Sequence, residues 1–161
     1  MRVTRTTRLA AVCAVQAVLV AGAVAPQLSA RLTGDEYRLD VAPVDPVDPF
    51  RGAYVALDYP GLQLPDQELD DRDPGDRPEG TVFVPLVRDG DVWRGGTPDT
   101  APPSAGPYLR CHADRQLRCG IESLFASQDE ALRLERELAD GAVARVRVDG
   151  RGNAAVVAVE A

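Results

Sequence analysis

Two cysteines in the second half of the chain are spaced so that they can react with each other. Cys111 and Cys119 flank a polar stretch centred on Arg115. A hairpin centred there places the two sulfurs across from each other, in the same register as Leu109 and Ile121. In an oxidising compartment the pair would form a disulfide worth about 2.5 kcal/mol by the loop-entropy model. Two free thiols are the alternative, and a metal or redox site is less favoured because the spacing is not Cys-x-x-Cys.

The other side chains capable of metal or acid–base chemistry are dispersed. His112 is the only histidine, and strand alternation turns it away from the face that holds Cys111. The acidic stretch 65–80 has enough carboxylates for calcium, but the EF-hand pattern fails because Asp71 stands at its glycine position and Arg77 at its final glutamate position. We therefore expect a surface histidine, a solvated acidic loop and no metal site.

A hydrolase or carbohydrate-processing enzyme with paired carboxylates is the enzymatic alternative. Glu122 and Asp58 are its candidate acids, and carboxyl groups about 5 to 10 Å apart would favour it. The chain has no lysine, which excludes Schiff-base, Ser-Lys and P-loop chemistry. We expect Glu122 to be structural, and we assign no catalytic residue and no cofactor.

The elements that position these residues begin with a basic and then apolar N-terminus. Arg2, Arg5 and Arg8 precede the run 9–25, which is apolar apart from Gln16. These 17 residues would rise about 25 Å as a helix, within the usual range for a membrane span. The positive end should stay cytoplasmic, which places the rest of the chain on the far side of the membrane.

A cleaved signal peptide is the alternative to an anchor. The Ala-Val-Ala run at 23–25 resembles a signal-peptidase site, but Pro26 directly after it should hinder cleavage. We favour a single-pass anchor in the cell membrane over residues 1–30, followed by one extracytoplasmic domain over residues 31–161. Secretion after cleavage remains the other possibility.

The charge of the exported part excludes some partners. Of the 18 basic residues, three precede the apolar run, so 15 remain against 25 acidic residues, a net charge of −10. Such a domain would repel phosphate-rich surfaces, so we expect no nucleic-acid partner and no general attraction to anionic lipid.

The domain itself is predicted to be α+β, mostly antiparallel β with one helix in its C-terminal half. A capping box at 127–130, an apolar stripe at Ala131, Leu134 and Leu138, and a closing Gly141 predict the helix. Alternating patterns and turn residues predict strands over 54–59, 81–88, 91–94, 108–110, 117–124, 142–148 and 154–160. An Asp89-Gly90 turn and a hairpin tip at 113–116 join two of the strand pairs.

Two stretches resemble the signature elements of the GDYXXLXY domain family. The first, PVDPVDPFRGAYVALDY, carries Pro43, Asp45, Pro46, Arg51, Gly52, Tyr54, Leu57 and Tyr59. The second carries Gly120, Ile121, Glu122 and Ser123 and ends in an aromatic. The resemblance implies a membrane-attached bacterial protein, and it brings no catalytic residues. The aspartate of the motif is Ala53 here, so a catalytic or metal role of that aspartate in relatives would be missing, whereas a turn-capping role would change little.

The sequence thus leaves two functional hypotheses. The first is an exported, membrane-tethered interaction or binding domain, accessory to an integral membrane protein. The second is a carboxylate-dependent hydrolase acting outside the cytoplasm. An anchor joined to a domain without a recognisable catalytic constellation favours the first.

Overall fold

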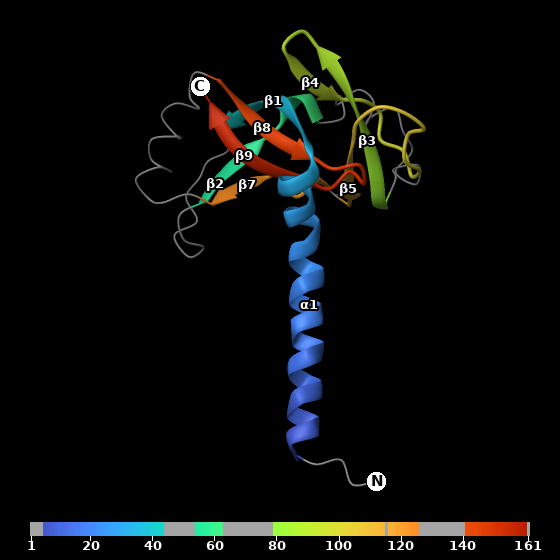
Figure 1. Ribbon diagram of the computed structural model, residues 1–161. Helices are drawn as coiled ribbons and strands as arrows, with labels where there is room; N and C mark the ends of the chain where they lie inside the picture. Colours follow the sequence, from blue (N-terminus) through green and yellow to red (C-terminus); the bar gives the residue numbers. More distant parts are fainter. Residues whose placement is uncertain (1–4, 44–53, 63–78, 115, 126–140, 161) are drawn as a thin grey trace.

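The computed structural model describes residues 5–43, 54–62, 79–114, 116–125 and 141–160. It shows a long N-terminal helix, α1 (Arg5–Thr33), that projects from a β domain as a single rod (Figure 1). At 29 residues the helix rises about 43 Å, and it continues through Pro26 for two more turns. The division between anchor and domain that we expect at residue 30 therefore falls inside α1.

The β domain is one curled, mixed sheet of nine strands. The strands are β1 (Asp35–Pro43), β2 (Tyr54–Asp58), β3 (Gly80–Asp89), β4 (Val92–Gly95), β5 (Tyr108–Ala113), β6 (Leu117–Arg118), β7 (Ser123–Phe125), β8 (Ala142–Val148) and β9 (Ala154–Glu160). A 3-10 turn, η1 (Pro60–Leu62), follows β2. The order is β6-β5-β3-β4-β1-β2-β7, with β8 joining β1 to β9. Among the described strands β1 and β4 pair in parallel and the other pairs are antiparallel.

Strand β1 organises the sheet because it pairs with β8 along 35–41, with β4 at Leu39, and with β2 at its end. Side chains alternate along the strands, so every second side chain lies on the buried face, as expected for a sheet with one buried and one solvent-facing side. The largest fully buried side chains are those of Leu39, Leu109, Ile121, Val82, Val84 and Val146. A single residue, Gly34, separates α1 from β1, so the helix enters the sheet at its central strand.

The predicted elements are confirmed in part. The hairpin over 142–148 and 154–160 is confirmed with its predicted ends. The turn between β3 and β4 lies one residue later than expected, at Gly90 and Asp91, because Asp89 pairs with Val92 and Gly90 supplies a φ of 63°.

The prediction of a single strand over 117–124 is wrong. The strand breaks after Arg118, because Gly120 takes a φ of 80° and turns the chain toward β2, with which β7 then pairs. The helix predicted to end at Gly141 lies outside the described residues.

Candidate functional site at the helix–domain junction

Most of α1 is unsupported by the domain. Every side chain along 5–28 is exposed, and the helix is long and apolar enough to cross a membrane, with a mean hydropathy of 2.1 over its most apolar window. A signal sequence near an N-terminus would satisfy the same criterion. The structure thus establishes a long apolar helix, consistent with either an anchor or a signal sequence.

The last turns of α1 are fixed to the domain by a buried carboxylate. Asp149, in the turn between β8 and β9, is 6% exposed and accepts a hydrogen bond from the Ser29 hydroxyl at 2.5 Å. The same carboxylate accepts bonds from the Arg151 amide at 2.9 Å, the Asn153 amide at 3.0 Å and Asn153 Nδ2 at 2.9 Å. One side chain therefore closes its own turn and holds the helix.

These contacts set the charge state of Asp149. Burial acts to raise the pKa of this carboxyl, but the hydrogen bonds from Ser29, Asn153 and Arg151 outweigh it and hold the pKa below its ordinary value. Asp149 is therefore the buried anion at the junction, and its donors are the groups that make its burial tolerable.

Further contacts surround this bond. Ala30 is fully buried, and a Cβ added to Gly34 would lie 2.8 Å from the backbone of Val148, so glycine is required where the helix passes into β1. Gln27 Nε2 donates to the Gly120 carbonyl at 3.1 Å. The Arg147 guanidinium donates to the Arg31 carbonyl, and the Arg31 guanidinium donates to the Val156 carbonyl at 3.3 Å. Helix and domain are joined as one packed body.

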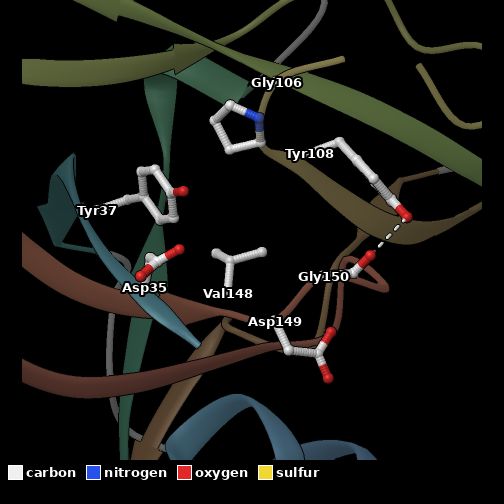
Figure 2. A pocket seen from close by; sticks show the side chains of 8 residues that line it. Asp35, Tyr37, Gly106, Tyr108, Val148, Asp149 and Gly150 are labelled. Carbon is white, nitrogen blue, oxygen red and sulfur yellow. Dashed lines mark hydrogen bonds between the residues drawn. The ribbon is translucent and has the colours of Figure 1, made fainter. Parts of the chain in front are cut away.

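A cavity of about 310 Å³ lies beside this junction (Figure 2). Asp35 and Tyr37 of β1 form one side, Tyr108 the other, and Val148 lies between them. Pro107 also lines the cavity. The hydroxyl of Tyr37 points into the space, whereas the carboxylate of Asp149 points away from it.

The two tyrosine rings of this cavity are held by their neighbours. Tyr37 packs edge-on against Trp93 at a centroid distance of 5.1 Å, and Tyr108 packs against Phe83 at 5.7 Å. The Tyr108 hydroxyl also donates to the Gly150 carbonyl at 3.2 Å. Burial and the nearby Asp35 carboxylate raise the pKa of Tyr37, so its ring is a neutral phenol at physiological pH.

The two motif elements lie side by side although they are about sixty residues apart. The Tyr59 hydroxyl, which is buried, donates to the Ile121 carbonyl at 2.9 Å, and the Leu57 amide donates to the Glu122 carbonyl at 2.9 Å. Burial and the Glu122 carboxylate raise the pKa of Tyr59, so it stays a neutral donor. Leu57, Tyr59 and Ile121 all belong to the core. These motif side chains hold two distant segments together.

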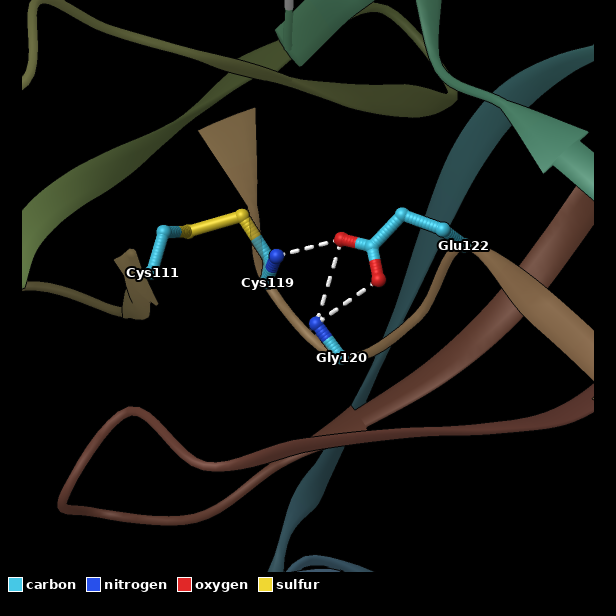
Figure 3. Close-up of a disulfide and its surroundings, with 4 residues drawn as sticks. All are labelled: Cys111, Cys119, Gly120 and Glu122. Atoms are coloured by element: carbon cyan, nitrogen blue, oxygen red, sulfur yellow. Dashed lines mark hydrogen bonds between the residues drawn. A yellow bond between two sulfur atoms is a disulfide. The ribbon is translucent and has the colours of Figure 1, made fainter. Parts of the chain in front are cut away.

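The predicted disulfide between Cys111 and Cys119 is present (Figure 3). It extends the β5–β6 register, in which His112 faces Arg118. Immediately after it, the Glu122 carboxylate accepts hydrogen bonds from the amides of Cys119 and Gly120 with both of its oxygens, the second oxygen at 3.0 Å from the Gly120 nitrogen. Glu122 therefore closes the loop that carries Gly120, the residue that Gln27 contacts.

Other predicted site residues have no comparable setting. Asp45, Pro46, Arg51 and Gly52 lie outside the described residues, as does the acidic loop over 63–78. Pro43 pairs with Leu57, Tyr54 pairs with Phe125, and Ser123 is exposed. His112 is exposed as expected, and within the described ranges no group of three His, Cys, Asp or Glu side chains is arranged to hold a metal.

Sequence reasoning missed the residues that make the junction. Ser29 lies at the end of an apolar helix, and Asp149 lies in a turn that the sequence indicates only by its glycines. The run Asp-Gly-Arg-Gly-Asn at 149–153 is typical of a turn closed by an aspartate side chain, and it is the one signal that could have identified Asp149. Nothing local connects it with a helix 120 residues earlier.

Comparison with known proteins gives one result. A search of curated proteins and a search of solved structures each found no match. A family model described as GDYXXLXY protein matches residues 16–159, which include the end of α1 and every described strand except the last residue of β9. The chain therefore belongs to the GDYXXLXY protein family.

Proposed function

We propose that this protein is a single-pass, membrane-anchored interaction module whose domain lies outside the cytoplasm, accessory to an integral membrane protein. The observation that carries the proposal is the junction between α1 and the sheet. An exposed apolar helix passes through one glycine into the central strand and is held there by the buried Asp149 carboxylate. A domain joined in this way is held at a set height and orientation above a bilayer, where a membrane protein can meet it.

The charge distribution supports the proposed topology. Arg5 and Arg8 lie at one end of α1 and the acidic domain lies at the other, which favours a cytoplasmic N-terminus. The junction also bears on cleavage. Ser29 and Ala30 follow the Ala-Val-Ala run, so a chain cut there would keep both residues and only the membrane-spanning part would be lost.

The alternative of a carboxylate-dependent hydrolase gains no support from the site. Both oxygens of Glu122 accept backbone amide hydrogen bonds, so this carboxylate serves the loop that it closes. A general acid or base must reach a substrate in a water-excluding cleft. Glu122 has a structural partner for each oxygen instead.

Affinity purification from native membranes after solubilisation in mild detergent tests the proposal. The full-length chain is compared with a chimera in which residues 5–25 are replaced by an unrelated membrane-spanning helix of the same length, while residues 26–161 stay unchanged. A stoichiometric integral membrane partner should be recovered with the full chain, and intact-mass measurement should show that the N-terminal segment is retained. A chain that is processed after Ala25, or recovered alone even after crosslinking in the membrane, would contradict the proposal.

The chimera locates the binding surface. Equal recovery of the partner by both proteins would assign recognition to the domain and the last turns of α1. Loss of the partner from the chimera alone would assign it to the apolar face of the helix. Both results support an accessory role, and they direct mutagenesis to different residues.

A further inference from the structure

We propose that the cavity beside the junction binds the primary ammonium group of a zwitterionic lipid headgroup, of the phosphoethanolamine type. This inference rests on the membrane anchoring proposed above. It does not depend on a protein partner.

The lining of the cavity favours a small organic cation. Two tyrosine rings and the exposed Asp35 carboxylate border it, and among the described residues that line it none is basic. This is notable in a chain with 18 arginines. Aromatic faces attract cations within about 6 Å of the ring centre, and a carboxylate accepts short hydrogen bonds from an ammonium group. A volume of about 310 Å³ admits a headgroup of a few heavy atoms.

The rigidity of the lining adds to this preference. The Tyr37 ring is braced by Trp93, and the Tyr108 hydroxyl is tied to Gly150. The walls are therefore formed before a ligand arrives, which lowers the entropic cost of binding. The Tyr37 hydroxyl points into the cavity and can accept one N–H of an ammonium group while Asp35 accepts another (Figure 2).

The height of the cavity points to lipid. The apolar run 9–25 covers about 25 Å of the hydrocarbon core, and Gln27, which donates to the Gly120 carbonyl of the domain, lies beyond it. The eight residues 26–33 add about 12 Å, somewhat more than the thickness of one headgroup layer. Asp35 follows two residues later, at the outer side of that layer.

A second charge suits the phosphate of the same headgroup. Arg151 is exposed and directly follows Gly150, a lining residue of the cavity. A domain of charge −10 can still bind a zwitterion when both of its charges are met.

The test uses the full chain in lipid nanodiscs of three compositions. One is phosphatidylglycerol alone, and the other two contain in addition about 30 mol% phosphatidylethanolamine or about 30 mol% phosphatidylcholine. Trp93, the only tryptophan, packs on Tyr37 and reports occupation of the cavity by its emission. Native mass spectrometry of the released protein counts the lipids that remain bound. We expect an emission change and retained lipid with phosphatidylethanolamine, and a clearly weaker response with phosphatidylcholine, whose ammonium has no N–H to donate.

Two matched variants assign the effect. Asp35→Asn should lower retention of phosphatidylethanolamine about tenfold through loss of one charge-assisted contact. Asp40→Asn, an exposed position on the same strand but outside the cavity, should leave it unchanged. Equal retention by the two variants, or equal responses to the two zwitterionic lipids, would overturn the proposal.

A soluble arm separates lipid from a free amine. Glycerophosphoethanolamine added to discs of phosphatidylglycerol alone should give no response at micromolar concentration. A full response would show that the cavity takes a soluble amine and would overturn the assignment to lipid. A chain that fails to enter the discs at all would instead contradict the anchoring on which this inference rests.

Discussion

Replacement of Asp149 by alanine is the perturbation that most directly probes the junction. It removes the acceptor of four hydrogen bonds, whose donors are the Ser29 hydroxyl, the Arg151 amide, and the amide and side chain of Asn153. A hydrogen bond to a charged group contributes about 1.5–3 kcal/mol, but effects within one network are not additive. Water can reach part of the exposed turn in the variant, so we expect Asp149→Ala to lower the free energy of unfolding by about 3 kcal/mol.

A double-mutant cycle isolates the part of this loss that joins helix to domain. Ser29→Ala should cost about 1.5 kcal/mol, and the double variant should cost little more than Asp149→Ala, which gives a coupling energy of about 1.5 kcal/mol. Urea unfolding of the full chain in detergent micelles, followed by Trp93 emission, supplies the four values. Asp40→Asn serves as the control for a lost surface carboxylate. Additive effects of the two substitutions would refute the claim that this bond holds the helix.

The same carboxylate predicts a pH dependence. Its pKa is lowered in the folded protein from the ordinary value of 3.8, so its contribution is complete above that value and is lost as the pH falls through the lowered pKa. The stability difference between wild type and Asp149→Ala should therefore be constant from pH 7 to about pH 5 and shrink below about pH 4. A difference that shrinks already between pH 7 and 6 would show that another group titrates.

Three further substitutions follow from the rest of the domain. Replacing Cys111 and Cys119 together by serine should cost about 2.5 kcal/mol for a loop of this length, and intact mass under non-reducing conditions should show no alkylatable thiol at these positions in the wild type. Tyr59→Phe should lower the free energy of unfolding by about 1–2 kcal/mol, because it leaves the buried Ile121 carbonyl without its donor. An unchanged midpoint of urea unfolding would contradict this. Gly152→Ala should lower the free energy of unfolding by more than about 2 kcal/mol. The φ angle of Gly152 is 77°, and the new Cβ would lie 2.7 Å from a ring atom of Tyr108. A variant with wild-type stability would show that the turn relaxes.

Features set by neighbouring residues could be predicted from the sequence. The β8–β9 hairpin has its predicted ends, because alternation along β8 and the glycine-rich turn after it favour one register, which shifts at a bulge between Arg145 and Val146. The disulfide follows from the same reasoning, since a hairpin centred on Arg115 leaves Cys111 opposite Cys119. The turn after β3 was one residue off, because a positive φ was needed at its first position and only Gly90 supplies it easily.

Features that depend on distant contacts could not be predicted. The pattern that predicts a single strand over 117–124 contains nothing to show that Gly120 turns the chain toward β2. The apolar run 9–25 gives no sign that α1 continues to Thr33, which contacts of Ala30 and its neighbours with the domain support. The bond between Ser29 and Asp149 joins residues that only the folded sheet brings together. A cavity formed by β1 and the segment before β5 has the same origin.

A distance measurement across the junction tests the central claim, that the apolar helix α1 and its domain form one rigid unit. Cys13 is exposed and free on α1, and Val87 is exposed on β3, so a Val87→Cys variant carries one spin label on each part. Double electron–electron resonance of the full chain in nanodiscs should give a single narrow distance distribution, and Asp149→Ala should broaden it. A wild-type distribution as broad as that of the variant would contradict the account, because the domain would then move freely on its helix.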